Sequence, residues 1–120
     1  DVRALADRFI AAIEAGDADA ALACYAPHAR IWHNTDGLEQ DVEANLALLD
    51  AFVGRTVSRR YRDRRLQLLP SGFVQQHRLC ATRHDGRQVE LHAAILCQVA
   101  DGRITRLDEY LDSAAVARFR

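Results

Sequence analysis

The spacing of apolar residues in the N-terminal part of the chain predicts helices. Apolar side chains recur there at steps of three and four, the period of an amphipathic helix, and the pattern ends at Gly16. This stripe consists of Val2, Leu5, Ala6, Phe9, Ile10 and Ile13. Asp17 is a suitable N-cap for a second, short helix that runs to about Tyr25, where Pro27 stops it.

A short strand and a third helix are predicted next. Residues Ala29 to Asn34 favour a strand, and Asp36 followed three residues later by Glu39 resembles a capping box. The helix that this box would open has an apolar stripe of its own and ends at Gly54. The stripe consists of Val42, Leu46, Leu49 and Val53.

Beyond residue 56 the pattern changes to strands separated by tight turns. Pro70-Ser71-Gly72, Asp85-Gly86 and Asp101-Gly102 are turn signals, because glycine there supplies the positive φ angle that tight hairpins require. The predicted strands are 57–69, 73–83, 88–99 and 104–111. Three helices followed by this meander predict an α+β fold, with the N-terminal helices packed on a curved, mainly antiparallel sheet.

Length, composition and charge describe one globular domain over residues 1–120. The sequence is 49% hydrophobic and carries a formal net charge of −1. A chain of this length buries roughly two thirds of its unfolded surface, which is enough for a core. The charge gives no general attraction to nucleic acid or to membranes, and no apolar run approaches the length of a membrane span.

Cysteine and histidine usage bears on compartment and cofactors. Cys24, Cys80 and Cys97 are odd in number and widely spaced in apolar surroundings, so we expect free thiols in a reducing cytoplasm. The histidines lack metal-ligand spacing and no Cys-x-x-Cys motif occurs, so we expect no metal and no cofactor. All 16 basic residues are arginine, which we interpret as codon usage in a GC-rich bacterium.

Six arginines lie between Arg55 and Arg65, around Tyr61. Such a cluster can contact phosphates while the aromatic ring stacks on a base. However, Asp63 interrupts the run, and alternation along a strand sends its arginines to both faces. We therefore expect salt bridges at a dimer interface or a solvated edge, and no nucleic-acid binding.

The last strand carries the first candidate for chemistry. Side chains alternate across a strand, so Glu109 shares its face with Leu107 and Leu111. Desolvation penalises the charged form of a carboxyl group and favours proton transfer near neutral pH. Glu109 is thus the leading candidate for an acid or base. The alternative is that it lies at the rim of the sheet and reaches water or an arginine.

The turn at Asp85-Gly86 decides which face of the central hairpin lines a pocket. A two-residue turn pairs Arg78 with Ala93, and places Gln76 and Arg78 among apolar residues as groups that bind an oxygen or a developing negative charge. If the pairing of the two strands shifts by one residue, the side chains that would face the pocket point to the opposite side of the sheet. In that register His77 enters the pocket as a candidate base, and Arg78 leaves it.

Glu109 reaches the same face if the turn at Asp101-Gly102 contains a bulge that pairs Ala93 with Glu109. Arg78 and Glu109 would then flank Ala93 on neighbouring strands, within reach of an ion pair. This arrangement has two interpretations: a catalytic carboxylate beside a cation, or a buried ion pair that is purely structural. We also expect Phe52 and Tyr61 to form pocket walls.

The order of elements and three local motifs resemble the SnoaL-like branch of the nuclear transport factor 2-like superfamily, whose members include ketosteroid isomerases and limonene epoxide hydrolases. The resemblance covers nearly the whole chain. The motifs are the opening helix Phe9 to Asp17, the strand Ile31-Trp32-His33-Asn34, and the ending Asp101-Gly102-Arg103-Ile104 through Glu109-Tyr110-Leu111-Asp112.

The resemblance implies a conical, cystatin-like roll with an apolar pocket, and a homodimer formed through the outer face of the sheet. Epoxide hydrolases of this group hold a catalytic water with residues that match Trp32, Asn34 and Glu109 here. They also have an arginine and an aspartate where this sequence has Gln76 and Arg78, so their carboxylate–arginine–carboxylate arrangement is not expected. The acid that ketosteroid isomerases use as a base is not matched either, because Asn34 stands nearest to its place.

Together these observations predict a pocket for a small, largely apolar molecule. As an enzyme, the protein would act as an isomerase, hydratase, cyclase or hydrolase by acid–base chemistry, with Glu109 as acid or base. Trp32 and Asn34 would orient water or substrate. The alternative is a non-catalytic ligand-binding or dimerisation domain, and the same fold can support either.

Overall fold

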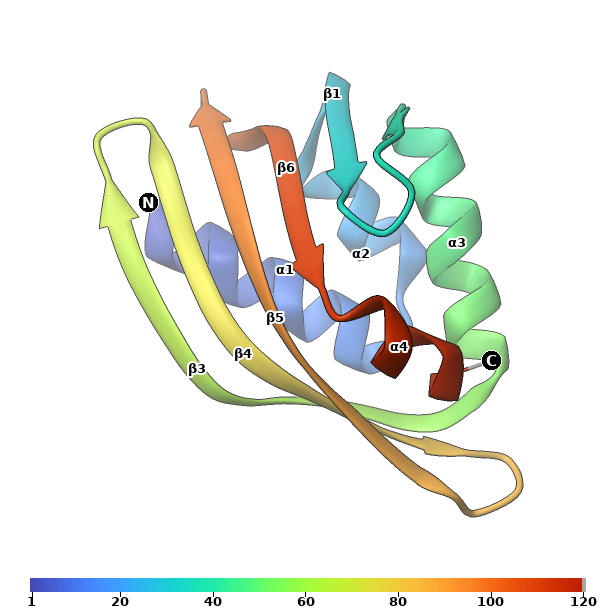
Figure 1. Cartoon of the computed structure of the whole chain (residues 1–120). Helices are drawn as coiled ribbons and strands as arrows, with labels where there is room; N and C mark the ends of the chain where they lie inside the picture. The colour runs from blue at the N-terminus through green and yellow to red at the C-terminus, as the bar shows by residue number, and fades with distance from the viewer. Residues whose placement is uncertain (120) are drawn as a thin grey trace.

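Figure 1 shows the computed structural model of the chain, which describes residues 1–119. A single curved sheet carries the helices on one face, as the α+β prediction expects. In chain order the elements are α1 (Val2–Ala15), α2 (Ala18–Ala23), β1 (Tyr25–His33), β2 (Glu39–Gln40), α3 (Val42–Gly54), β3 (Thr56–Leu69), β4 (Gly72–Arg83), β5 (Gln88–Ala100), β6 (Arg103–Leu111), α4 (Ser113–Val116) and a short 3₁₀ helix (Ala117–Phe119).

The sheet has the strand order β2-β1-β6-β5-β4-β3. β3 to β6 form the predicted antiparallel meander, and β1 lies parallel to β6 at its other side. β3, β4 and β5 are long and bend strongly, so that the sheet wraps around α1 (Figure 1). This curvature leaves a space between the sheet and α3 that becomes the candidate site.

Capping residues explain where the helices begin. The side chains of Asp1, Asp17 and Asp41 each accept a hydrogen bond from a backbone N–H of the first helical turn, in α1, α2 and α3 respectively. α1 ends at Gly16, whose φ of 70° is in the left-handed region that favours glycine. The predicted N-cap of the third helix was wrong: Asp36 instead accepts from the N–H of Leu38, and α3 starts after Asp41.

The boundary between α2 and β1 also differs from the prediction. α2 ends at Ala23, and β1 already begins at Tyr25, so that Pro27 lies inside a strand. A proline cannot donate to a strand ladder, and here it falls in the irregular stretch of the β1–β6 pairing between Tyr25 and Arg30. The short β2 and α4 were not predicted.

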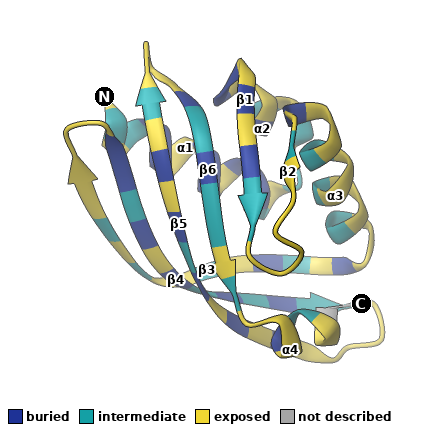
Figure 2. Ribbon diagram, turned by 45° about the horizontal axis from the view of Figure 1, so that its top comes forward, coloured by how far each residue is buried: buried dark blue, intermediate teal, exposed yellow. Residues whose placement is uncertain are grey.

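The core lies between the concave face of the sheet and α1. Buried and exposed residues alternate along β4 and β5 (Figure 2), as expected for strands with one covered face. α1 buries the stripe that the sequence predicts, including Leu5 and Ala6, which are almost fully inaccessible. Arg59 of β3 is also buried, and its guanidinium donates to the carbonyls of Ile13 and Glu14 at the end of α1.

Candidate active site

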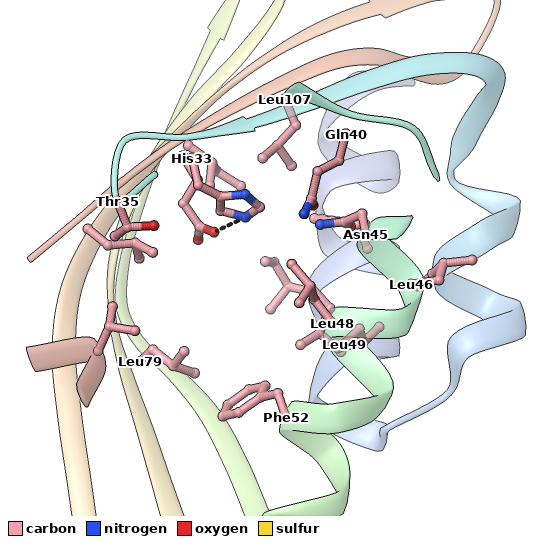
Figure 3. A pocket seen from close by; sticks show the side chains of 18 of the residues that line it. His33, Thr35, Gln40, Asn45, Leu46, Leu48, Leu49, Phe52, Leu79 and Leu107 are labelled. Carbon is pink, nitrogen blue, oxygen red and sulfur yellow. Dashed lines mark ion pairs between the residues drawn. The ribbon is translucent and has the colours of Figure 1, made fainter. Parts of the chain in front are cut away.

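A cavity of about 350 Å³ lies between the concave face of the sheet, α1 and α3. This volume suits a small organic ligand. Most of the side chains around it are apolar, among them Ile10, Leu49, Leu79, Leu91 and Leu107. In Figure 3, leucines and Phe52 of α3 face His33 and Leu79 across an open space. Polar side chains also border the space, among them His33, Gln40, Asn45, His77 and Glu109, and such groups can orient a ligand.

His33 and Glu109 form an ion pair within this cavity. β1 and β6 run parallel with His33 opposite Glu109, and Nε2 of His33 lies 3.2 Å from Oε1 of Glu109 (Figure 3). Both side chains are mostly buried, at 15% and 20% exposure. The hydrogen bond to Glu109 raises the pKa of His33, although burial opposes this. The contact with Glu109 thus favours the protonated form of His33.

Glu109 faces the cavity as predicted, but its neighbours differ from the expectation. A bulge between Gln98 and Val99 shifts the β5–β6 register, and Glu109 lies opposite Ile95. The expected pairing with Ala93 and the ion pair with Arg78 were therefore wrong.

The alternation of β1 is the reverse of the one expected, and His33 takes the place foreseen for Trp32 and Asn34. The Trp32 ring packs edge-on against Tyr110, with ring centroids 5.3 Å apart. Asn34 is exposed, and its amide exchanges two hydrogen bonds with the backbone of Leu111. Neither borders the cavity. Buried Ala29 and Ile31 share a face with His33, and this was the available signal.

The central hairpin adopts the slipped register. Its loop contains three residues rather than two, because Arg83 pairs with Arg87 around His84 to Gly86. Gly86 has a φ of 84°, the left-handed conformation that such a loop requires. The extra residue shifts the register by one, so that His77 lies opposite Ala93.

The slip brings His77 into the cavity and removes Arg78 and Gln76 from it. His77 borders the cavity and is 5% exposed. Arg78 lies on the outer face of the sheet, where it contacts Asp63 at 3.0 Å and Glu90 at 2.9 Å. Gln76 is exposed on the same face. The prediction that Gln76 and Arg78 bind substrate inside the pocket was thus wrong in position.

A chain of hydrogen bonds reaches His77 from the neighbouring strand. Both Nε and one terminal nitrogen of Arg64 donate to Oε1 of Gln75, at 3.0 and 2.9 Å. Gln75 is fully buried, and its Nε2 lies 2.9 Å from Nδ1 of His77. Nε2 of His77 is buried and has no hydrogen-bond partner among residues 1–119. Burial lowers the pKa of His77 to about 4.

Aromatic residues complete the walls. Phe52 and Tyr61 border the cavity, as expected. The Tyr61 ring lies edge-on to His77 with centroids 4.6 Å apart. Tyr25 also borders the cavity and donates from its hydroxyl to Oδ1 of Asn45 at 3.3 Å. Burial raises the pKa of both tyrosines, so they remain neutral phenols.

Two further findings concern metal ions and membranes. Within residues 1–119, no group of three or more His, Cys, Asp or Glu side chains is arranged to hold a metal ion. None of the helices in the same range is both long and apolar enough to span a membrane.

Comparison with known proteins agrees on the fold. A proposed polyketide cyclase from Xanthomonas campestris pv. campestris superposes with a TM-score of 0.85 at 20% identity, over 99% of this chain and 96% of that one. AclR, a proposed hydroxylase from Streptomyces galilaeus, gives 0.86 at 13% identity, over 98% and 79%. An epoxide hydrolase of the limonene epoxide hydrolase type from M. tuberculosis gives 0.78 at 18% identity, over 98% and 86%.

The sequence comparisons identify the family of the chain but no activity. No curated protein matches the chain significantly. A family model described as SnoaL-like domain matches residues 6–107, which is most of the chain. This confirms the resemblance drawn from the motifs, and the chain belongs to the SnoaL-like domain family.

Proposed function

We propose that this protein is an acid–base enzyme that moves a proton on a small, largely apolar organic molecule, with Glu109 as the group that exchanges the proton. The observation that carries the proposal is the His33–Glu109 pair inside an apolar cavity. A purely structural ion pair has no need of empty space beside it. Here the space adjoins the carboxylate and is large enough for a ligand.

His33 has a supporting role in this proposal. Nε2 of His33 lies 3.2 Å from Oε1 of Glu109, and the hydrogen bond between them raises the pKa of His33. The other carboxylate oxygen, Oε2, can accept a proton from a bound molecule. The proton that Glu109 takes from one atom of the bound molecule can return to another atom of the same molecule, which restores the carboxylate beside His33. Such a dyad suits isomerases, hydratases, cyclases and hydrolases alike.

The structural relatives support this class of reaction without selecting a substrate. They include a proposed cyclase and an epoxide hydrolase, two reactions in which a proton is transferred. Their identities to this chain are 20% or less. We infer from them that the pocket serves organic substrates, as the apolar lining also suggests.

The test uses three small aromatic probes that differ in functional group: the ketone 2-tetralone, the hydrocarbon indene and the epoxide styrene oxide. Incubation in D₂O followed by NMR detects exchange of acidic C–H protons in the first two and ring opening in the third. We expect at least one probe to react in the presence of the protein, and Glu109→Gln to slow this reaction about 100-fold or more.

Asp108→Asn is the matched control, because Asp108 is the neighbouring carboxylate on the outer face of β6, where it contacts Arg106. The control should retain the full rate, and circular dichroism should show that both variants are folded. Equal rates for Glu109→Gln and the unaltered protein would refute the proposal. Binding of probes without any reaction would instead favour a non-catalytic ligand-binding domain.

We also propose that two copies associate through the outer face of the sheet. Leu96 and Tyr110 are 41% and 47% exposed there, and Trp32 packs beside Tyr110. Exposed apolar groups on a sheet face are typical of an interface. Light scattering after gel filtration should give the mass of a dimer, and Tyr110→Glu should give a monomer. An unchanged mass for this variant would contradict the assignment of this face.

A further inference from the structure

We propose that residues 35–49 form a flap that opens and closes the mouth of the cavity, and that an ion pair between Glu39 and Arg106 on the outer face of the sheet is its latch. The flap comprises the loop after β1, the short β2 and the first half of α3. The inference concerns access to the cavity, so it applies to a catalyst and to a binding protein alike. It does not rest on the role proposed for Glu109.

The flap supplies most of the rim of the cavity. Among the residues that border the cavity within the range 1–119, the exposed ones are Thr35, Asp36, Leu48 and Arg55, and they mark its mouth. The first three belong to residues 35–49. Figure 3 shows Thr35 and Leu48 on different sides of the open space. A displacement of this segment therefore widens or narrows the entrance.

α3 is held less firmly than α1. Among the 13 described residues of α3, Val42 alone is buried, whereas α1 buries six of its 14 (Figure 2). Leu46 and Leu49 pack at the margin of the core and stay partly exposed beside the cavity. The hydroxyl of Tyr25 ties the helix to β1 through a hydrogen bond of 3.3 Å to Asn45. Segments with few buried apolar contacts open at a lower free energy than the core, so α3 can move while α1 stays in place.

The stretch before α3 is held still more loosely. All residues from Asn34 to Glu39 are exposed. β2 joins the sheet through two residue pairs, Ile31 with Gln40 and Trp32 with Glu39. Such a short edge strand contributes little stability by its backbone pairing. Side-chain contacts must therefore carry much of the attachment of β2.

The Glu39–Arg106 pair provides this attachment. Glu39 lies opposite Trp32 on the outer face, and its carboxylate accepts a hydrogen bond from Nη1 of Arg106 on β6. Because the strand order is β2-β1-β6, this contact reaches across β1 and ties the edge strand to the interior of the sheet. Asp108 holds Nε of Arg106 at 3.1 Å, and Arg30 lies 4.0 Å from the carboxylate of Glu39.

The pair has the properties of a contact that can be released. The contact with Arg106 lowers the pKa of Glu39, so its carboxylate is charged at neutral pH. The side chains are 34% and 44% exposed, for Arg106 and Glu39 respectively. Ion pairs at such positions are weak and are screened by salt. The latch can therefore open without disruption of the core.

Both ends of the flap are fixed, so its middle can move while the rest of the sheet stays folded. Before the flap, the side-chain amide of Asn34 exchanges two hydrogen bonds with the backbone of Leu111. After it, the hydroxyl of the buried Thr56 donates to the carbonyl of Phe52 at 3.0 Å. Loop and helix-end positions of this kind are where lids are hinged.

Hydrogen exchange of the full chain without ligand, followed by mass spectrometry, tests the flap. We expect amides of residues 46–49 to exchange about 100-fold or more faster than those of residues 6–13 in α1. Glu39→Gln should raise exchange in residues 35–49 by about 2–5-fold at low salt. Salt at about 0.5 M should bring the unaltered protein close to this variant. Equal exchange in the two helices would overturn the proposal.

Glu90→Gln is the matched control for the latch. Glu90 forms an exposed ion pair with Arg78 at 2.9 Å on the same outer face, but on β5, which is three strands from β2. This variant should leave exchange in residues 35–49 unchanged. If Glu39→Gln changes the flap no more than Glu90→Gln does, Glu39 is not a latch.

A thiol placed inside the cavity tests whether the flap controls access. Leu107 borders the cavity from β6 and is 4% exposed. In Leu107→Cys the reaction of the new thiol with N-ethylmaleimide can be followed on the tryptic peptide 107–118, which contains no native cysteine. Adding Glu39→Gln should raise the labelling rate by the same factor as exchange in the flap, and adding Glu90→Gln should not.

A labelling rate that Glu39→Gln leaves unchanged, together with faster exchange in residues 35–49, would show that the segment moves without controlling entry, and would overturn the proposal. If Leu107→Cys does not fold, the exchange experiment still decides whether the flap and its latch exist, because it uses a native cavity.

Discussion

The burial of His77 should make the stability of the fold depend on pH. The side chain is 5% exposed, and burial lowers its pKa from 6.5 to about 4. Each unit of pKa difference between folded and unfolded states corresponds to about 1.4 kcal/mol. Protonating His77 therefore costs the folded state about 3 kcal/mol more than the unfolded chain. This is a large share of the stability of a small domain.

The sign follows from the direction of the shift. Because the folded pKa is the lower one, the contribution of His77 is complete above pH 6.5 and is lost as the pH falls toward about 4. His33 acts in the opposite sense. Its pKa is raised, so its contribution is complete below the unfolded value and is lost as the pH rises through the folded value. Below pH 6.5 the contribution of His33 stays constant, so a change in stability in this range reports on His77 and not on His33.

The assay is urea unfolding between about pH 7 and about pH 4, with the variant His77→Phe as the reference. From pH 7 to pH 4 the unaltered protein should lose about 3 kcal/mol of unfolding free energy relative to this variant. His92→Phe, at an exposed position of β5, should follow the unaltered protein. Parallel curves for His77→Phe and the unaltered protein would refute the burial argument.

Two further predictions concern backbone positions, and both are measured as free energies of unfolding in urea. Gly72→Ala should destabilise by about 3 kcal/mol, because a Cβ there would collide with a backbone carbonyl of β5, whereas Gly54→Ala has open space and should be neutral or stabilising. Asp41→Ala should cost about 1 kcal/mol through loss of the N-cap of α3, and Asp36→Ala less. Equal effects within either pair would contradict these assignments.

The sequence predicts most of the elements because their signals are local. Helical spacing of apolar residues identifies α1 and α3, and the Gly-containing turns after Leu69, Arg83 and Ala100 separate β3 to β6. The start of α3 was missed because two aspartates compete as N-caps. Asp36 has the better motif, but Asp41 is the one followed directly by the helix.

The register of the sheet, in contrast, cannot be predicted from local sequence signals. On β4, polar residues occur at both parities, with Gln75 and His77 on one face and Gln76 and Arg78 on the other. The choice between them depends on the number of residues in the loop around Gly86, and the two-residue loop was the wrong one. The apolar residues Phe73, Leu79 and Ala81 share the parity of His77, and this is the signal that would have selected the right face.

Three single-residue irregularities shape the site, and each changes which side chains lie on the concave side of the sheet. The three-residue loop selects His77 over Arg78, the bulge after Gln98 aligns Glu109 with Ile95, and the bulge near Asp63 brings Arg64 to Gln75. Without the bulge after Gln98, Glu109 would lie opposite Ala94 on the other face of β5, and a two-residue loop would place Arg78 rather than His77 opposite Ala93. Which titratable side chains border the cavity is therefore decided by the register, and local motifs do not fix the register.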